Sequence, residues 1–178
     1  MNIRYKRKRK SGIQTISSCA KLKLEDKFDR RKALSRPIYE TEGDRLNESF
    51  LKTKLEKMWN CKLIKLPKKS MLDFCAERDK EIVAFIEMKH RNKPSGSYPT
   101  YMLSLAKLQA AKRLHEDTGK ICLLVVQWTD LLEMVDLAKC DFRIAMGGRT
   151  DRGDPQDIEP VAHIPFSGFG LVGSDGKT

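Results

Sequence analysis

The sequence lacks several features that mark large classes of proteins. No uninterrupted apolar run approaches the roughly 20 residues that a membrane-spanning helix requires. The basic N-terminus is not followed by the apolar core of a secretory signal. The five cysteines form no Cys-x-x-Cys pair, and none stands at zinc-finger spacing from any of the three histidines. We therefore expect a cytoplasmic protein with reduced cysteines, in which any metal ligands are oxygen atoms.

Acidic residues are scarce at the start of the chain. The first 36 residues contain 13 Lys or Arg but three Asp or Glu, whereas residues 37–178 contain 22 basic and 21 acidic residues. Blocks of like charge rarely fold alone, and basic arms commonly bind the phosphates of nucleic acids. We therefore predict a flexible basic arm over residues 1–36 and one folded domain over residues 37–178. A solvated tail or a targeting signal is the alternative role for the arm.

The remaining sequence has the periodicities of an α/β domain. Apolar residues recur at three- and four-residue spacing over residues 42–59 and 101–117, which predicts two amphipathic helices; Thr41 is the expected cap of the first, with Asp44 three residues later. The order of helix, three strands, helix and strand predicts a mixed central sheet flanked by helices. The expected strands cover residues 61–66, 71–76, 81–90, 121–128 and 142–146, a short helix covers 129–138, and the run 161–166 is an edge strand or a dimer contact.

Charged residues interrupt the strand expected over residues 81–90. Side chains alternate between the two faces of a strand, so the even-numbered positions from 82 to 88 form an entirely apolar face. Glu87 and Lys89 lie on the other face with Val83 and Phe85, about 6.6 Å apart along the strand. An acid and a lysine at the end of an apolar strand are costly unless they are exposed, paired or bound to a ligand. The pattern indicates a functional site, with a surface ion pair as the alternative.

Asp73 interrupts the preceding strand, where aspartate is uncommon. The polar stretch 77–81 predicts a hairpin tip between the two strands. A tip centred on Asp79 places Asp73 diagonally from Glu87, and a tip centred on Lys80 places it directly opposite. In both cases the two carboxylates share a face, with Cβ atoms about 5 to 8 Å apart. Carboxylates this close repel each other unless a cation lies between them, and Mg²⁺ prefers such oxygen ligands.

The segments Leu72-Asp73-Phe74 and Ile86-Glu87-Met88-Lys89, separated by a hairpin, resemble the motif of the PD-(D/E)XK nuclease superfamily. The resemblance covers roughly residues 42–128, and Leu72 stands where many members have proline. It implies an α/β fold with a restriction-endonuclease-like core in the order α-β-β-β-α-β. The compact spacing is most similar to Holliday-junction resolvases and small phage endonucleases, which implies the cytoplasm of a phage-infected host cell as a location.

The resemblance also implies a catalytic role for each matching residue. Asp73 and Glu87, with the backbone carbonyl of Met88, would bind Mg²⁺ or alternatively Mn²⁺. Lys89 would assist the attacking water or stabilise the charge that develops on the phosphate. These roles together describe metal-assisted hydrolysis of a phosphodiester bond.

Other residues are candidates because of where they stand around the motif. Many members of the superfamily add a glutamate from the helix before the hairpin; Glu48 is the best match and Glu42 is the reserve. Some members add a glutamine or lysine from the following helix, where Gln109 stands. Tyr98 and Tyr101 could stack on an unpaired base or pack at the start of that helix. The expected contacts to DNA are Arg7, Arg9, Arg91, Lys93, Gln109, Lys112 and Arg113.

The expected function is a Mg²⁺-dependent DNA endonuclease, specific for branched DNA or junctions, that acts in recombination or repair. The resemblance implies a homodimer, because two strands must be cut. One alternative is an exonuclease of the same superfamily; its second helix often carries Gln-x-x-x-Tyr, whereas Gln109 is followed four residues later by Arg113. The other alternative is a non-catalytic nucleic-acid-binding protein whose functional part is the basic arm.

Overall fold

The computed structural model describes residues 41–67, 69–148 and 157–173. The arm predicted over residues 1–36, with Arg7 and Arg9, lies outside these residues. The helices are α2 (Glu42–Trp59) and α3 (Leu105–Thr118), with a 3-10 turn η2 (Phe166–Gly168). The strands are β1 (Lys62–Lys65), β2 (Phe74–Arg78), β3 (Glu81–His90), β4 (Thr100–Ser104), β5 (Ile121–Gln127), β6 (Leu132–Asp136), β7 (Arg143–Gly148), β8 (Ile158–Pro165) and β9 (Gly170–Leu171).

Helix α2 begins and ends where local sequence signals place it. The Thr41 hydroxyl accepts a hydrogen bond from the Asp44 N–H at 3.1 Å, and the Asp44 carboxylate accepts one from the Thr41 N–H at 2.9 Å. This reciprocal capping box satisfies two backbone donors at the helix start. The helix ends at Asn60, which adopts a left-handed conformation with φ of 47°. The predicted helix over 42–59 and its cap are confirmed.

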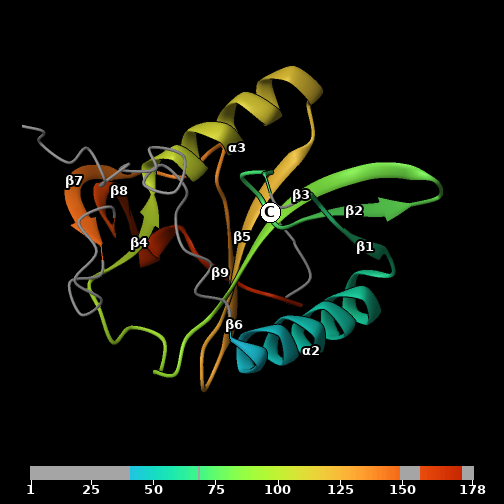
Figure 1. Ribbon diagram of the computed structural model, residues 1–178, viewed down its shortest axis with the longest axis horizontal. Helices are drawn as coiled ribbons and strands as arrows, with labels where there is room; N and C mark the ends of the chain where they lie inside the picture. The colour runs from blue at the N-terminus through green and yellow to red at the C-terminus, as the bar shows by residue number, and fades with distance from the viewer. Residues whose placement is uncertain (1–40, 68, 149–156, 174–178) are drawn as a thin grey trace, which may run out of the picture. The chain divides into compact units, whose positions relative to one another are not determined.

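Six strands form the main sheet in the order β1-β2-β3-β5-β6-β9. Strands β3 and β5 are parallel, and the other neighbouring pairs are antiparallel, so the sheet is mixed. Figure 1 shows α3 on one face of this sheet and α2 on the other. Since α3 connects β4 to the central strand β5, it lies directly beside the parallel pair. The predicted mixed α/β fold is confirmed.

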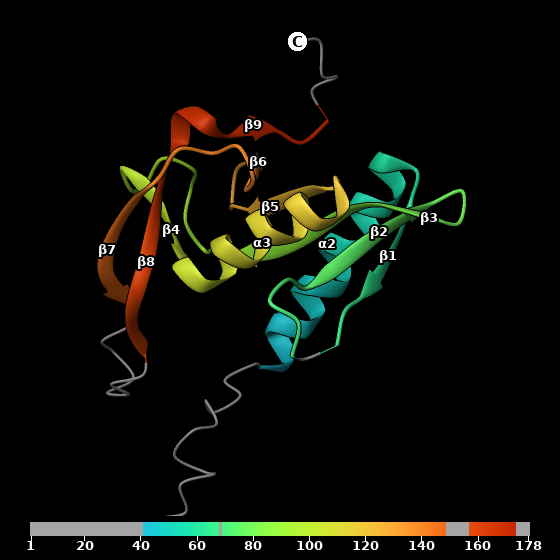
Figure 2. The same ribbon diagram turned by 90° about the horizontal axis from the view of Figure 1, so that it is seen from above.

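A second sheet contains three strands in the order β4-β8-β7 (Figure 2). One hydrophobic cluster joins it to the main sheet and α3, with Leu103 and Ala162 from the small sheet and Leu108 and Leu124 from the larger elements. A separate cluster lies under α2 and contains Leu51, Leu55, Ile86 and Met88 among others. The two faces of β3 therefore meet different cores, and the charged residues at its end lie at the boundary between them.

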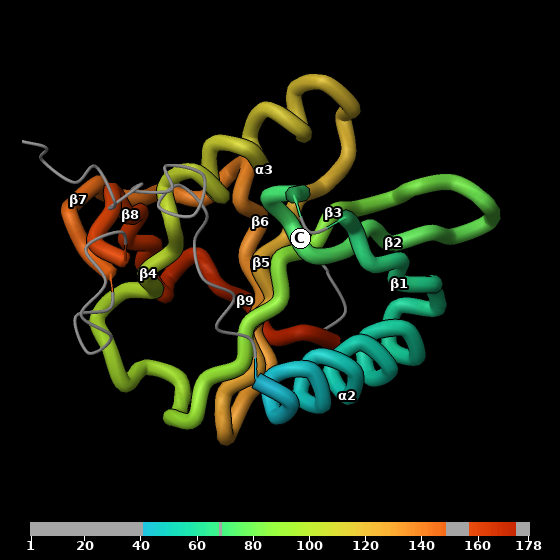
Figure 3. The backbone as a smooth tube through the Cα atoms, viewed as in Figure 1, coloured from blue at the N-terminus to red at the C-terminus, as the bar shows by residue number. Residues whose placement is uncertain are grey.

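The β2–β3 hairpin projects from the main sheet (Figure 3) and contains an irregularity that sets its register. Its tip is a two-residue turn at Asp79 and Lys80, both with positive φ (53° and 67°) although neither is glycine. Near the tip Glu77 pairs with Ile82, but beyond it Ala76 pairs with Ala84, so β3 carries one extra residue at Val83. This bulge also turns Val83 toward the α2 cluster, contrary to the predicted alternation.

Three further predictions about the elements are wrong. The second helix begins at Leu105 instead of residue 101, because Thr100–Ser104 pairs with β8 as strand β4. The segment expected as a short helix over 129–138 contains β6, which pairs with β5. The run 161–166 belongs to β8, which lies between β4 and β7 and is a central strand. Each of these errors concerns a strand whose partner is distant in sequence or whose apolar residues have a spacing that also suits a helix.

The cysteines within the described residues are free thiols. Cys75 and Cys122 are buried, and Cys61 and Cys140 are partly buried. Burial raises the pKa of the Cys122 thiol to about 11, so it stays protonated and inert at neutral pH. In the same described segments, no helix is both long and apolar enough to cross a membrane.

Candidate active site

Asp73 lies immediately before β2, where its backbone already joins the sheet. Its N–H donates to the Ile86 carbonyl at 3.0 Å, and its carbonyl accepts from the Leu66 N–H at 2.9 Å. Its carboxylate accepts a hydrogen bond from the Met88 N–H at 3.0 Å. Phe74 is the first residue of β2 in the register and pairs with Ile86, and Asp73 and Glu87 are the next residues beyond this pair. Both acids lie within 4 Å of the Lys89 ammonium group, in agreement with the prediction that they share one face.

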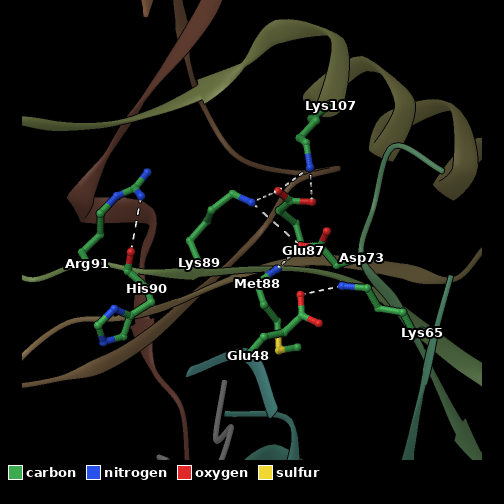
Figure 4. A network of polar contacts seen from close by, with 9 residues as sticks. All are labelled: Glu48, Lys65, Asp73, Glu87, Met88, Lys89, His90, Arg91 and Lys107. Carbon is green, nitrogen blue, oxygen red and sulfur yellow. Dashed lines mark hydrogen bonds and ion pairs between the residues drawn. The ribbon is translucent and has the colours of Figure 1, made fainter. Parts of the chain in front are cut away.

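Glu87 is a fully buried acidic residue, with no exposed side-chain surface. Both of its carboxylate oxygens accept hydrogen bonds from Lys107 Nζ of α3, at 2.6 and 2.7 Å. Lys89 Nζ lies 2.5 Å from Glu87 Oε1 and 3.9 Å from Asp73 Oδ2. Figure 4 shows the two lysines approaching Glu87 from different directions. We call Asp73, Glu87, Lys89 and Lys107 the inner cluster; it holds two negative and two positive charges.

The charges of the inner cluster stabilise one another. Burial raises the pKa of the Asp73 carboxyl, but the nearby Lys89 and Lys107 ammonium groups lower it more, so that the pKa lies below its usual value of 3.8. Burial lowers the pKa of Lys89, but the Glu87 and Asp73 carboxylates raise it more, so that the pKa lies above 10.5. Both side chains are therefore charged at neutral pH.

A cleft of about 310 Å³ opens beside the end of β3. Its walls include Asp73, Met88 and Lys89, together with Glu48 of α2 and Lys65 of β1. Glu48 Oε2 pairs with Lys65 Nζ at 2.5 Å, and both side chains are partly exposed. Figure 4 shows this pair on the α2 side of β3 and Glu87 on the α3 side. Glu48 thus shares the cleft with Asp73 while it is paired to a lysine of its own. The reserve candidate Glu42 is exposed in the first turn of α2.

The residues expected to contact DNA divide into three groups. Arg91 lines the cleft next to His90, with its guanidinium 5.3 Å from the centre of the Tyr101 ring. Lys93 is exposed in the loop after β3, 5.6 Å from the centre of the Tyr98 ring. Tyr101 itself is a buried core residue of β4. The positions on α3 lie elsewhere: Gln109 and Arg113 are exposed away from the inner cluster, and Lys112 donates to the Ala138 carbonyl at 2.9 Å.

Lys107 is the residue that the sequence reasoning missed. Gln109 was the candidate from the second helix, but Lys107 is the α3 side chain that reaches Glu87. Lys107 stands one turn before Ala111 and next to Leu108, both of which are fully buried. A lysine on the buried stripe of an amphipathic helix requires a partner, and that position in the helical repeat was the available signal.

Asp73, which lines the cleft, and Glu87, which is buried beside it, fit the ligand chemistry of Mg²⁺. Within residues 41–67, 69–148 and 157–173, no three side chains of His, Cys, Asp or Glu gather into a ready-made metal cage. Mg²⁺ seldom requires such a cage, because it keeps several waters and binds through one or two carboxylates and substrate phosphates. Asp73 and Glu87 are two such carboxylates, and one ammonium group lies within 4 Å of both. The donor set therefore suits a hard divalent cation.

A comparison with protein families agrees with the motif. Residues 34–172 match the family described as "Phage putative PDDEXK endonuclease". A comparison with curated proteins found no similar sequence. Among solved structures, the chain is similar to Hjc, a Holliday junction resolvase from Archaeoglobus fulgidus, with 15% identity, a TM-score of 0.45, and coverage of 67% of this chain and 86% of that one. The match over residues 34–172 spans most of the sequence, and the chain therefore belongs to this family of phage PDDEXK endonucleases.

Proposed function

We propose that this protein is a Mg²⁺-dependent DNA endonuclease that hydrolyses phosphodiester bonds in branched DNA. The observation that carries the proposal is the convergence of Asp73, Glu87 and Lys89 at one end of β3, beside a cleft of about 310 Å³. Membership in a nuclease family gives the reaction class. Two carboxylates and a lysine held beside an open cleft are the groups that metal-assisted phosphodiester hydrolysis requires.

Each residue of the site has a separate task in this proposal. Asp73, Glu87 and the Met88 carbonyl would hold the ion, which is Mg²⁺ or, as a substitute, Mn²⁺. When bound, the ion polarises the scissile phosphate and lowers the pKa of a bound water. Lys89 remains protonated because two carboxylates face it, and its ammonium group donates to the phosphate oxygen that gains charge during attack.

The surroundings of the cleft provide the DNA contacts. Glu48 completes the ligand set directly or through water, after exchange of its contact with Lys65. Arg91 and Lys93 contact phosphates without reading base sequence, which suits recognition of DNA shape. We further propose that two copies act together, because resolution of a branch requires cuts in two strands. The dimer places one cleft on each strand.

The test is cleavage of supercoiled plasmid, linear duplex and a four-way junction, each with Mg²⁺ and with a chelator. We expect Mg²⁺-dependent cutting that is fastest on the junction. Asp73→Asn and Lys89→Ala should each reduce the rate by at least about 10²-fold while DNA binding persists. Matched controls are Asp79→Asn at the exposed hairpin tip and Lys57→Ala in the last turn of α2, which should cut like the wild type.

The same assay separates the competing functions. Release of single nucleotides from the linear duplex, with the plasmid left intact, would identify an exonuclease. Junction binding without Mg²⁺-dependent cutting would identify a non-catalytic DNA-binding protein. Wild-type cleavage by Lys89→Ala would refute the assigned site, whatever the preferred substrate is.

A further inference from the structure

Glu87 is already paired before any divalent cation is considered. The carboxylate is fully buried, and Lys107 donates to both of its oxygens at 2.6 and 2.7 Å. A buried carboxylate without compensation is strongly unfavourable, so this contact supplies a positive charge where one is needed. A Mg²⁺ ion bound by Glu87 would supply the same compensation at the same oxygens. A divalent ion placed at these oxygens would be repelled by the Lys107 ammonium group, which contacts both of them.

The two lysines that contact Glu87 are not equivalent. Lys89 belongs to the same strand as Glu87 and also lies 3.9 Å from Asp73, so it is held by both acids. Lys107 comes from α3, and both of its hydrogen bonds go to Glu87. Figure 4 shows Lys107 reaching Glu87 from α3, apart from the Lys89 side chain. Lys107 is therefore the cation that can leave Glu87 without breaking the contact between Lys89 and Asp73.

The Lys107 side chain is partly exposed, so its ammonium group can move from Glu87 into solvent. Its side chain is 28% exposed, whereas the Glu87 side chain has no exposed surface. The lysine therefore stands between the buried carboxylate and solvent. Its flexible four-carbon stem can carry the ammonium group outward at a small cost, because the group regains hydration there. A phosphate group of bound DNA would be a stronger acceptor than water for the displaced ammonium.

We propose that Lys107 is an internal competitor of the catalytic cation: it neutralises Glu87 in the metal-free protein and must withdraw before the divalent ion binds there. The inference rests on the proposed function, because it takes Asp73 and Glu87 as the ligands. It assigns Lys107 a positioning and regulatory role instead of a place among the catalytic residues. Competition of this kind weakens metal binding in the free protein and strengthens it when a phosphate holds the lysine.

The test is direct titration of Mn²⁺ into the full chain by calorimetry, without DNA. Lys107→Met keeps the length of the side chain and removes its charge, and we expect it to bind Mn²⁺ roughly tenfold more tightly than the wild type. Lys107→Arg keeps the charge and should bind no more tightly than the wild type. Lys57→Met, an exposed substitution on α2, is the matched control and should leave the affinity unchanged.

The outcomes distinguish this inference from the proposed function. If Asp73→Asn and Glu87→Gln bind Mn²⁺ as tightly as the wild type does, the assigned metal site is wrong and the inference is wrong with it. If they do weaken it, but Lys107→Met binds Mn²⁺ with unchanged or lower affinity, Lys107 is a structural residue and the inference alone is overturned. Lys107→Gln retains a hydrogen-bond donor and gives the same comparison should Lys107→Met fail to fold.

Discussion

Helices α2 and α3 are each joined to the main sheet by an acid–lysine pair, and the two pairs lie on opposite faces of the sheet. In the inner pair, Lys107 of α3 contacts Glu87 of β3; in the outer pair, Glu48 of α2 contacts Lys65 of β1. The side chains of the inner pair are 28% and 0% exposed, whereas those of the outer pair are 48% and 29% exposed. Both pairs join a carboxylate to an ammonium group, but the inner pair is more buried than the outer pair. Because a buried ion pair costs more to break than an exposed one, we expect the inner pair to have the larger effect on the site.

The largest expected difference between the pairs is in cleavage. Glu87→Gln should reduce the rate by about 10²- to 10³-fold, because a proposed metal ligand becomes neutral. Glu48→Gln should reduce it by about tenfold, because its carboxylate is shared with Lys65 and reaches the cleft from the opposite side of β3. Single-turnover rates on a junction substrate would measure both. Equal losses would show that the two faces contribute alike to the reaction.

A smaller difference is expected in stability. Lys107→Met should lower the free energy of unfolding by about 2 kcal/mol, because Glu87 remains buried with one lysine instead of two. Lys65→Met should lower it by less than about 1 kcal/mol, since its partner is open to water. Urea denaturation of both variants would test the comparison. Added Mn²⁺ should restore more stability to Lys107→Met than to the wild type. A larger loss in Lys65→Met would reverse the ranking.

The smallest effect concerns pH. Since the pKa of Asp73 is lowered on folding, its charge stabilises the fold above its usual value of 3.8, and that contribution disappears as the pH falls through the still lower folded pKa. The raised pKa of Lys89 has the opposite sign: its contribution is present below 10.5 and disappears as the pH rises above that value. The stability difference between wild type and Asp73→Asn should therefore shrink as the pH falls from 3.8 through the lower folded pKa of Asp73. A difference that stays constant as the pH falls below 3.8 would contradict the prediction.

Local signals predicted the parts of the fold that depend on neighbouring residues. The capping box at Thr41 and Asp44 fixes the start of α2 within four residues, so no distant contact is needed. The strand over residues 81–90 was also predicted, because its apolar run is long and continuous. In contrast, the sequence pattern over β4 predicts the first turn of a helix, since Tyr101 and Leu105 have helical spacing and the partner strand β8 begins more than 50 residues later.

The site was predictable in its acids and less so in its second lysine. Asp73, Glu87 and Lys89 are unusual because they are charged residues within or next to apolar strands, and the structure places Lys89 within 4 Å of both acids. The exact register of the hairpin was not predictable, because the tip turn and the bulge at Val83 each shift the pairing and only together place Phe74 opposite Ile86. The position of Lys107 on the buried stripe of α3 indicates that it needs a partner, but which residue is that partner depends on how α3 packs across β3.

Because side chains alternate between the two faces of a strand, the number of residues between the hairpin tip and each acid determines the face on which that acid lies. The bulge at Val83 changes this number by one in β3. Without the extra residue, the pairing at the tip would continue unchanged and Asp73 would face the α2 core beside Ile86, leaving Glu87 alone on its side. A single inserted or deleted residue in either arm of the hairpin would have the same result. An insertion or deletion in this hairpin therefore keeps both acids on one face only when it changes the length of an arm by an even number of residues. The bulge at Val83 thus limits which insertions and deletions the hairpin can accept, although it lies several residues from the acids.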